Sequence, residues 1–389
     1  MRVAQERWDS ARGSTLPSSS AELVWVFGSD QPSFCGAAFD DLRRRFPAGV
    51  LFGCSTAGEV LDERVFDDSV AVTAVSFERS STRIQCAKTP LASKAESFAA
   101  GAALAHSLER EGLRHIFVLA DGIECNGSDL VRGLRSVLPQ HVTLSGGLAG
   151  DGTRFGQTFV MANDRPASHM AACVGLYGDD LELGFGSMGG WDPFGPLRRV
   201  TRAEGNVLFE LDGQPALSLY RAYLGEAARD LPASGLLFPL SIRTQASSRP
   251  VVRTIVGINP DDASLTFVGD VPQGSIAQLM KANFDRLIDG ASDAALSASS
   301  SAPSSATKTR SEASMLESVD LAILVSCVGR KLVLKQRTEE EVEAVRAVLG
   351  PKPFMTGFYS YGEICSEGRQ GDCDLHNQTM TVTTFRERA

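Results

Sequence analysis

The sequence predicts an α/β (α+β) protein of two related lobes, each with a mixed β-sheet flanked by helices in a layered sandwich. Apolar runs typical of buried strands alternate with helical spacings along most of the chain, and this alternation is typical of α/β folds. A Gly-rich turn also recurs three times at the same point of a strand–helix–strand passage. With 389 residues, 43% of them hydrophobic, the chain can build a core without metal or disulfide support.

In the first half, short apolar runs bounded by turn residues predict the strands, and apolar positions three or four residues apart predict the helices. A strand–helix–strand passage favours parallel pairing, and strands joined without a helix favour antiparallel pairing. The predicted strands are 23–28, 50–54, 70–77 and 116–120, the predicted helices are 34–46, 93–111 and 129–138, and strands alone follow from 158 to 186.

In the second half, the same patterns predict a helix over 276–288, a strand over 321–328 and a helix over 338–349. Thr338 and Glu341 have the spacing of a capping box at the start of the last helix. A longer unit also recurs, because 83–151 parallels 265–363 once a Ser-rich segment is removed.

These repeats predict a first domain over 22–220 and a second over 221–389. Two segments have compositions typical of disorder. Residues 1–21 are Ser-rich towards their end and predict a disordered N-terminal segment. Residues 291–318 contain ten serines and seven alanines and predict a flexible insertion within the second domain.

The three recurring turns cover 53–59, 145–151 and 357–363, and each ends in an acidic residue. Glycines let the backbone approach a ligand closely, and α/β folds place their ligands at strand ends. We therefore expect the acids to gather around a cation or an amino group, although solvated acids on structural hairpins are the alternative. The predicted ligand-binding residues are Gly53, Cys54, Ser55, Thr56, Gly58 and Glu59, then Gly146, Gly147, Gly150 and Asp151, then Tyr359, Ser360, Tyr361, Gly362 and Glu363, and finally His376 and Asn377.

Signatures of catalysis and cofactor binding are weak. The first turn has Glu59 where a phosphate-binding loop needs lysine, and no G-x-S-x-G motif surrounds Ser55 or Ser360. An enzyme using Cys54 or Ser55, or Tyr361 with His376, is therefore disfavoured. Cys365, Cys373 and His376 form C-x7-C-x2-H, which could hold a metal or haem but lacks the spacing of a zinc site. No cofactor is certain, and structural thiols are the alternative.

Charge and hydropathy limit the partners. The formal net charge of −9, with no basic run, disfavours nucleic acid. No apolar stretch is long enough to cross a bilayer, and the first residues do not resemble an export signal. The eight cysteines never form a C-x-x-C pair, as expected of reduced thiols. We therefore expect a cytoplasmic protein without membrane insertion.

Five stretches of the chain together match a known family. They are GCSTAGE (53–59), ADGIECNGSDLVRGLRSVLP (120–139), SGGLAGDG (145–152), 189–225, and GFYSYGEI with DLHNQTMTVT within 357–383. These stretches resemble the FIST-domain family of bacterial sensory proteins, which have a FIST N part and a FIST C part. The resemblance implies a non-enzymatic sensor of a small ligand, such as an amino acid, that signals to a separate partner. A histidine kinase or a cyclic-di-GMP enzyme is the implied partner, and one branch of the family implies a haem-binding nitric oxide sensor instead.

Overall fold

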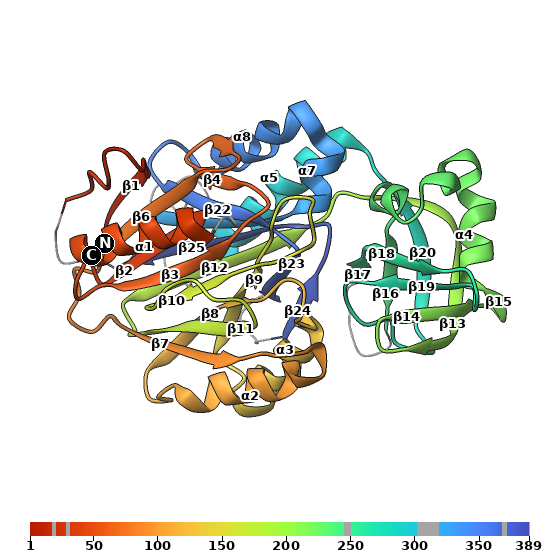
Figure 1. Ribbon diagram of the computed structural model, residues 1–389, viewed down its shortest axis with the longest axis horizontal. Coiled ribbons are helices and arrows are strands. Elements are labelled where there is room, and N and C mark those ends of the chain that lie inside the picture. Colours follow the sequence, from red (N-terminus) through yellow and green to blue (C-terminus); the bar gives the residue numbers. More distant parts are fainter. Residues whose placement is uncertain (18–20, 29–31, 245–249, 302–318, 368–371, 389) are drawn as a thin grey trace.

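The computed structural model describes residues 1–17, 21–28, 32–244, 250–301, 319–367 and 372–388. Three β-sheets with helices on their outer sides form a large body, and a smaller β-rich module, which also carries one helix, lies beside it (Figure 1). The two chain ends lie close together on the body, where the Met1 amino group contacts the Glu387 carboxylate at 3.1 Å. The prediction of an α/β protein with mixed sheets is confirmed.

Each sheet of the body is built on the same three-strand centre, in which two strands run parallel and a third pairs antiparallel with the first. This is the pairing that the sequence predicts. Sheet one is ordered β1 (Arg2–Arg7), β6 (Val70–Ser76), β2 (Leu23–Gly28), β3 (Val50–Ser55) and β10 (Val160–Ala162). Sheet two is ordered β24 (Asp372–His376), β23 (Gly362–Glu367), β9 (Thr143–Leu148), β8 (Leu113–Ala120), β11 (Met170–Tyr177) and β7 (Arg83–Pro90). Sheet three is ordered β12 (Leu181–Met188), β25 (Met380–Glu387), β21 (Leu321–Cys327), β22 (Phe354–Ser360), β4 (Glu59–Leu61) and β5 (Arg64–Phe66).

The three sheets exchange strands in a cycle. The chain that leaves β3 enters sheet three as β4, the chain that leaves β22 enters sheet two as β23, and the chain that leaves β9 enters sheet one as β10. Each Gly-rich turn is therefore a crossing from one sheet to the next. Sheets two and three consequently contain strands from both halves of the chain.

The faces that the three sheets turn towards one another form a common core. Alternate residues of β2, including Trp25 and Phe27, lie in this core, and the residues between them pack on the opposite face. Trp25 packs edge-on against Phe117 of β8, and Phe27 stacks on Phe358 of β22, each with ring centroids 4.8 Å apart. The contacts join sheet one to both other sheets, so the core holds the three crossings in place.

Helices cover the outer faces, with α2 and α3 on sheet two and α5 and α8 on sheet three (Figure 1). Their apolar faces explain this placement, as in α3, where Leu130, Val131 and Leu134 are buried. The helices are α1 (Pro32–Arg45), α2 (Ser97–Ser107), α3 (Gly127–Val137), α4 (Ala216–Leu224), α5 (Phe284–Ser301), α7 (Val328–Leu334) and α8 (Thr338–Leu349).

The β-rich module, residues 192–281, lies between β12 and α5 in the chain and has its own core around Val200, Tyr220 of α4 and Phe267. In the repeat that builds the centre of sheet two, α2 follows β7 within a few residues, whereas in the repeat that builds the centre of sheet three the module separates β12 from α5. The predicted match of 265–363 to 83–151 therefore aligned a strand of the module with β7, whose true counterpart is β12. The module strands are β13 (Asp192–Glu204), β14 (Val207–Leu211), β15 (Gln214–Pro215), β16 (Leu240–Arg243), β17 (Val251–Arg253), β18 (Ile255–Asn259), β19 (Ser264–Phe267) and β20 (Ile276–Lys281).

The prediction of a disordered segment over 1–21 is wrong for residues 2–7. They form β1, which pairs antiparallel with β6, and Trp8 behind them is 5% exposed and donates from its indole to Asp41 at 3.0 Å. The serines that predicted disorder lie later in the segment, and averaging over 21 residues hid the strand before them. Residues 18–20 lie outside the described residues.

The prediction of a flexible insertion over 291–318 is wrong for its first part. Helix α5 continues to Ser301, and Ala291, Ala294, Ala295 and Ala298 are fully buried. These alanines have the helical spacing i, i+3, i+4 and i+7, which a count of small residues does not register. They let α5 approach β12 closely, because a side chain at Gly184 would collide with the Ala298 carbonyl. Residues 302–318 lie outside the described residues.

Two local predictions are also wrong. Residues 276–281 form β20 rather than a helix, since β13 and β16 pair with them on either side, and α5 begins at Phe284. The capping box does not form at α8. Thr338 donates to the Lys335 carbonyl at 2.5 Å, and Glu341 turns into the core instead of back to the helix start.

Candidate functional site

The three Gly-rich turns contact one another directly. The amide of Ala57 donates to the Tyr359 carbonyl at 2.8 Å, the amide of Tyr361 donates to the Leu148 carbonyl at 3.2 Å, and the amide of Gly150 donates to the Ser55 carbonyl at 2.9 Å. The three turns therefore meet as the sequence predicts, but their acids do not gather around one cavity, because of Glu59, Asp151 and Glu363 only Glu59 lines the large cavity described below. The contacts arise because each turn is a crossing between sheets.

The three parallel strand pairs, β2–β3, β8–β9 and β21–β22, each have a glycine at the same register position of their second strand. Gly53, Gly146 and Gly357 lie opposite Val26, Val118 and Leu324 of the parallel neighbour. A Cβ at any of the three would collide with the carbonyl oxygen of that partner. Glycine is required here because the two strands approach too closely for a side chain.

Glu59 and Glu363 occupy equivalent positions in the strand pairing. Glu59 pairs with Phe358, the residue after Gly357, and Glu363 pairs with Gly147, the residue after Gly146. Thr56 donates to Glu59 at 2.5 Å, and Ser360 donates to Glu363 at 2.7 Å. Both carboxylates also accept from the hydroxyl and the amide of one residue, Ser69 at 2.7 and 3.2 Å for Glu59, and Thr379 at 3.0 and 3.2 Å for Glu363. Each glutamate thus ties its turn to the residue just before an antiparallel strand, which is β6 for Glu59 and β25 for Glu363.

Burial dominates the electrostatics of both glutamates. Desolvation raises the pKa of Glu59 to about 7, although Thr56, Ser69 and the Lys331 charge oppose the rise. Desolvation raises the pKa of Glu363 to about 8 against the bonds from Ser360 and Thr379. Glu363 is fully buried and lines none of the cavities described below, so its role in this structure is to hold the turn.

Asp151 is not the third member of this set. The register places Val160 of β10 where the other two crossings have glutamate, and Met170 where they have Ser69 and Thr379. Asp151 instead accepts from the amides of Phe155, Gly156 and Gln157 at 2.7–3.0 Å and from the Tyr361 hydroxyl. Despite opposing desolvation, these bonds lower its pKa. In the crossing from β9 to β10, Val160 thus replaces the glutamate, and Met170 replaces the residue whose hydroxyl would donate to it.

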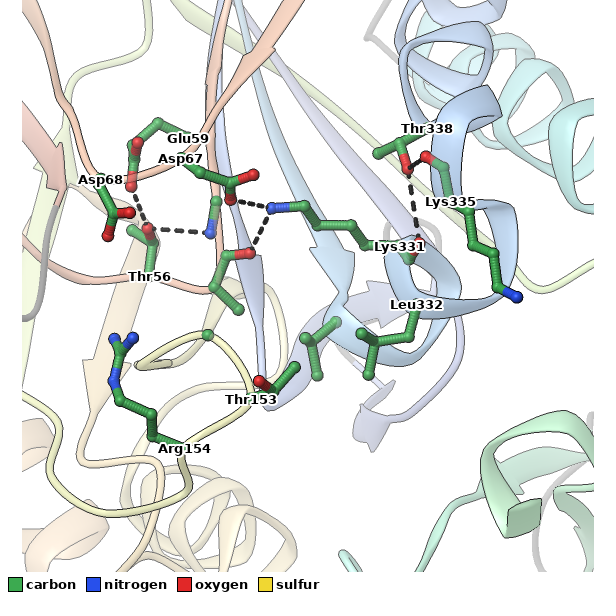
Figure 2. A pocket seen from close by; sticks show the side chains of 14 residues that line it. Thr56, Glu59, Asp67, Asp68, Thr153, Arg154, Lys331, Leu332, Lys335 and Thr338 are labelled. Carbon is green, nitrogen blue, oxygen red and sulfur yellow. Dashed lines mark hydrogen bonds and ion pairs between the residues drawn. The ribbon is translucent and has the colours of Figure 1, made fainter. Parts of the chain in front are cut away.

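A cavity of about 570 Å³ opens beside the first turn (Figure 2). Its walls come from the first turn, from the start of the 152–154 loop, from the turn before β6 and from α7 with the residues after it. It brings together three of the predicted ligand-binding residues, Thr56, Gly58 and Glu59. The remaining lining residues are Ala57, Asp67, Asp68, Gly152, Thr153, Arg154, Val328, Lys331, Leu332, Lys335 and Thr338.

This first cavity is lined by charges of both signs. Lys331 reaches across it, donating to the Ala57 carbonyl at 2.8 Å and pairing with Asp67 (Figure 2). Arg154 lies on the side of Thr56 and Asp68. Asp68 and Lys335 adopt φ values of 51° and 54°, a left-handed conformation that is uncommon outside glycine and that gathers at ligand sites.

Gly58 is needed where Lys331 crosses. Its φ is 139°, a region that favours glycine, and a Cβ there would collide with the Lys331 ammonium. The carbonyl of Gly58 also accepts from the Tyr359 amide at 2.8 Å. The first turn is therefore shaped by the helix that follows β21 as well as by its own sequence.

The other predicted residues lie apart from this cavity. Tyr361 lines a second cavity of about 190 Å³, and Cys54 and Ser55 line a much smaller one. Ser55 Oγ accepts from the Phe159 amide at 2.9 Å and so anchors the start of β10. Gly146 and Gly147 lie in β9, Gly150 and Asp151 after it, Tyr359 and Ser360 in β22, Gly362 and Glu363 in β23, His376 at the end of β24 and Asn377 just after it.

The possible metal or haem ligands do not form such a site. Cys365 is buried in β23, Cys373 lies in β24, and His376 is 6% exposed with its pKa lowered to about 4, chiefly by burial. Among the described residues, no three His, Cys, Asp or Glu side chains are grouped to hold a metal ion. None of these three residues lines a cavity described here, so this arrangement does not fit haem binding through them.

The sequence prediction missed Asp67, Asp68, Arg154, Lys331 and Lys335. A usable signal was present for Lys331, since it follows the end of β21 and strand ends carry ligands in α/β folds. The Gly-rich turns follow the second strand of each parallel pair, whereas Lys331 follows the first. The acids before β6 and Arg154 had no such signal, because only the crossing between sheets brings them to the same cavity.

The fold and this cavity define an α/β protein with a polar cavity at the crossing of its sheets. The chain belongs to the FIST family: the FIST N domain model matches residues 22–214, and the FIST C domain model matches residues 216–366. This family is associated with small-ligand sensing in signal transduction.

Two individual proteins are similar to this chain. An uncharacterised protein of Methanocaldococcus jannaschii is 24% identical over 281 residues, which cover 66% of this chain and 53% of that protein. The chain thus spans about half the length of this curated relative. A chorismatase crystal structure aligns over 99% of this chain and 98% of its own, with 10% identity and a TM-score of 0.35. Among the described residues, no helix is long and apolar enough to span a membrane.

Proposed function

We propose that this protein is a sensor that binds a small zwitterion, an amino acid, in the 570 Å³ cavity and signals the binding to a separate partner protein. The observation that carries the proposal is the mixed charge of the cavity walls. Asp67 and Asp68 offer carboxylates to an ammonium group, and Arg154, Lys331 and Lys335 offer cations to a carboxylate. A cavity lined by one sign of charge would favour a simple anion or cation instead.

Ligand binding in this cavity would change the protein's structure through the Lys331–Asp67 ion pair. A ligand that engages either side chain competes with a contact that joins α7 to the turn before β6. Lys331 also holds the first turn through the Ala57 carbonyl, so occupancy would act on the crossing between sheets one and three. A histidine kinase or a cyclic-di-GMP enzyme is the proposed receiver, and a cytoplasmic location stays a prediction.

Thermal unfolding with a panel of amino acids tests the ligand. A ligand at a hundred times its Kd adds about 2.7 kcal/mol to the free energy of unfolding, which is readily measured as a rise in Tm. The amine and the acid that correspond to the best amino acid, each lacking one charged group, should bind much more weakly. This comparison separates a zwitterion site from a simple anion or cation site.

Variants connect the effect to this cavity. Asp68→Asn and Arg154→Gln should each reduce the ligand-induced rise in Tm, because each removes a charge from the wall. Asp230→Asn, an exposed carboxylate in the module, is the matched control and should respond as the unmodified protein does. The proposal fails if no amino acid raises Tm, or if the two cavity variants respond like the control.

A further inference from the structure

The second cavity, of about 190 Å³, lies where the β-rich module meets the body. Leu236, Thr254, Val256, Phe267 and Val268 of the module line one side. The opposite side comes from the chain after β8, from the loop after β9, from the end of β21 with the start of α7, and from the turn after β22. Phe155, Val328 and Tyr361 are among the residues of this side, and Lys94 also lines the cavity.

Most of this second cavity is apolar, and one wall is aromatic. Phe155 stacks on Tyr361 with ring centroids 4.6 Å apart and an interplanar angle of 21°. Phe155 and Val256 are 48% and 46% exposed, which is unusual for such large apolar side chains beside a cavity. A ligand seated between them would remove this apolar surface from water.

The polar groups of the second cavity are few. The Thr254 side chain is 4% exposed, and its hydroxyl has no hydrogen-bond partner among the described residues. A buried hydroxyl without a partner is costly, and Thr254 lines the cavity, so rotation about its χ1 angle would bring the hydroxyl to an atom of a bound ligand. Lys94 is the one charged residue among the described residues that line the cavity.

We propose that this cavity is a second ligand site, for a small carboxylic acid with a single apolar ring. Its volume is close to that of the engineered cavity of about 150 Å³ that binds benzene, so one ring fits and a larger cofactor does not. The ring would pack against Phe155, the carboxylate would pair with Lys94, and Thr254 would donate to a ligand oxygen. The ligand would join the module to the body, and its charged and polar partners, Lys94 and Thr254, do not line the amino-acid cavity, although Val328 lines both.

Titration calorimetry with phenylacetate and benzoate tests this site, with phenylacetamide as the neutral isostere. Thr254→Val should weaken phenylacetate binding by about three- to tenfold, the value of one hydrogen bond. Lys94→Gln should abolish the preference for phenylacetate over phenylacetamide. Thr266→Val in the module and Lys352→Gln after α8 are matched controls outside the cavity, and both should bind as the unmodified protein does.

Val256→Trp gives a steric test at a half-exposed position where folding is tolerant, and it should block binding while leaving Tm nearly unchanged. Asp68→Asn separates the two sites, because it should weaken amino-acid binding and leave phenylacetate binding intact. The proposal is overturned if neither acid binds at millimolar concentration. It is also overturned if Thr254→Val, Lys94→Gln and Val256→Trp bind phenylacetate as tightly as the controls.

Discussion

The Lys331 ammonium donates to the carbonyl oxygen of Ala57 at 2.8 Å, although the two residues are 274 positions apart in the chain. Lys331 lies in α7, which follows β21 of sheet three, and Ala57 lies in the Gly-rich turn between β3 and β4. The same ammonium pairs with Asp67. One side chain therefore fixes two walls of the cavity on which the proposed function rests.

Removing this ammonium should affect stability and binding together. In Lys331→Met the free energy of unfolding should fall by roughly 1 kcal/mol, because a charged donor to Ala57 is lost at a half-buried site. The amino-acid-induced rise in Tm should shrink as well. Urea unfolding and thermal shift measure the two effects, with exposed Lys352→Met as the control. A variant with unchanged stability would show that the contact does not hold the turn.

Glu363 should make the protein less stable as the pH rises. Its pKa is raised from 4.5 to about 8 by burial, so between these values the folded state holds a proton that the unfolded state has released. The stability from this group is complete below about pH 4.5 and is lost as the pH rises through 8. Glu363→Gln should flatten that decline in urea unfolding measured from pH 5 to 8, whereas exposed Glu343→Gln should not.

Glu59 has the same sign, with a pKa raised to about 7, and would contribute to the same decline. The double variant Glu59→Gln, Glu363→Gln should therefore be flatter than either single variant. If the unmodified protein gains stability between pH 5 and 8 from these residues, the assignment of burial as the dominant cause is wrong.

Arg330 and Glu341 form a fully buried ion pair at 2.8 Å. Arg330 also donates to the carbonyls of Leu287 and Gly189, and Glu341 accepts from Ser326 and Tyr359. Glu341→Leu should lower the free energy of unfolding by about 3–5 kcal/mol, because it leaves a buried guanidinium unpaired. The double variant Arg330→Met, Glu341→Leu should recover part of that loss in urea unfolding. A double variant less stable than Glu341→Leu would contradict this account.

Gly357 should not tolerate a side chain. Gly357→Ala places a Cβ against the Leu324 carbonyl, where no flexible side chain can move away, and should cost about 1–3 kcal/mol or more. Gly257→Ala in the module is the control, because its Cβ would make only ordinary contact with Thr266 at 3.4 Å. Thermal unfolding compares them, and equal Tm values would argue against the close approach of β21 and β22.

The sequence by itself determined the local features of this protein. The strand Leu23–Gly28 and the helix Thr338–Leu349 have the predicted bounds, because short-range apolar spacing is enough to specify them. The three crossing turns were recognisable because the close strand approach requires glycine at a fixed position, at Gly53 and Gly357 for example. The chain's place in the FIST family follows from the same local motifs.

Tertiary structure decided what those motifs do. Asp151 resembles Glu59 in the sequence, yet the register shows that Val160 is the true counterpart, since strand pairing rather than spacing from a glycine sets equivalence. The cavity likewise depends on Lys331, Asp67 and Arg154, which meet only because strands cross from sheet to sheet. Contacts between residues hundreds of positions apart leave no local pattern, so their physical cause appears only in the fold.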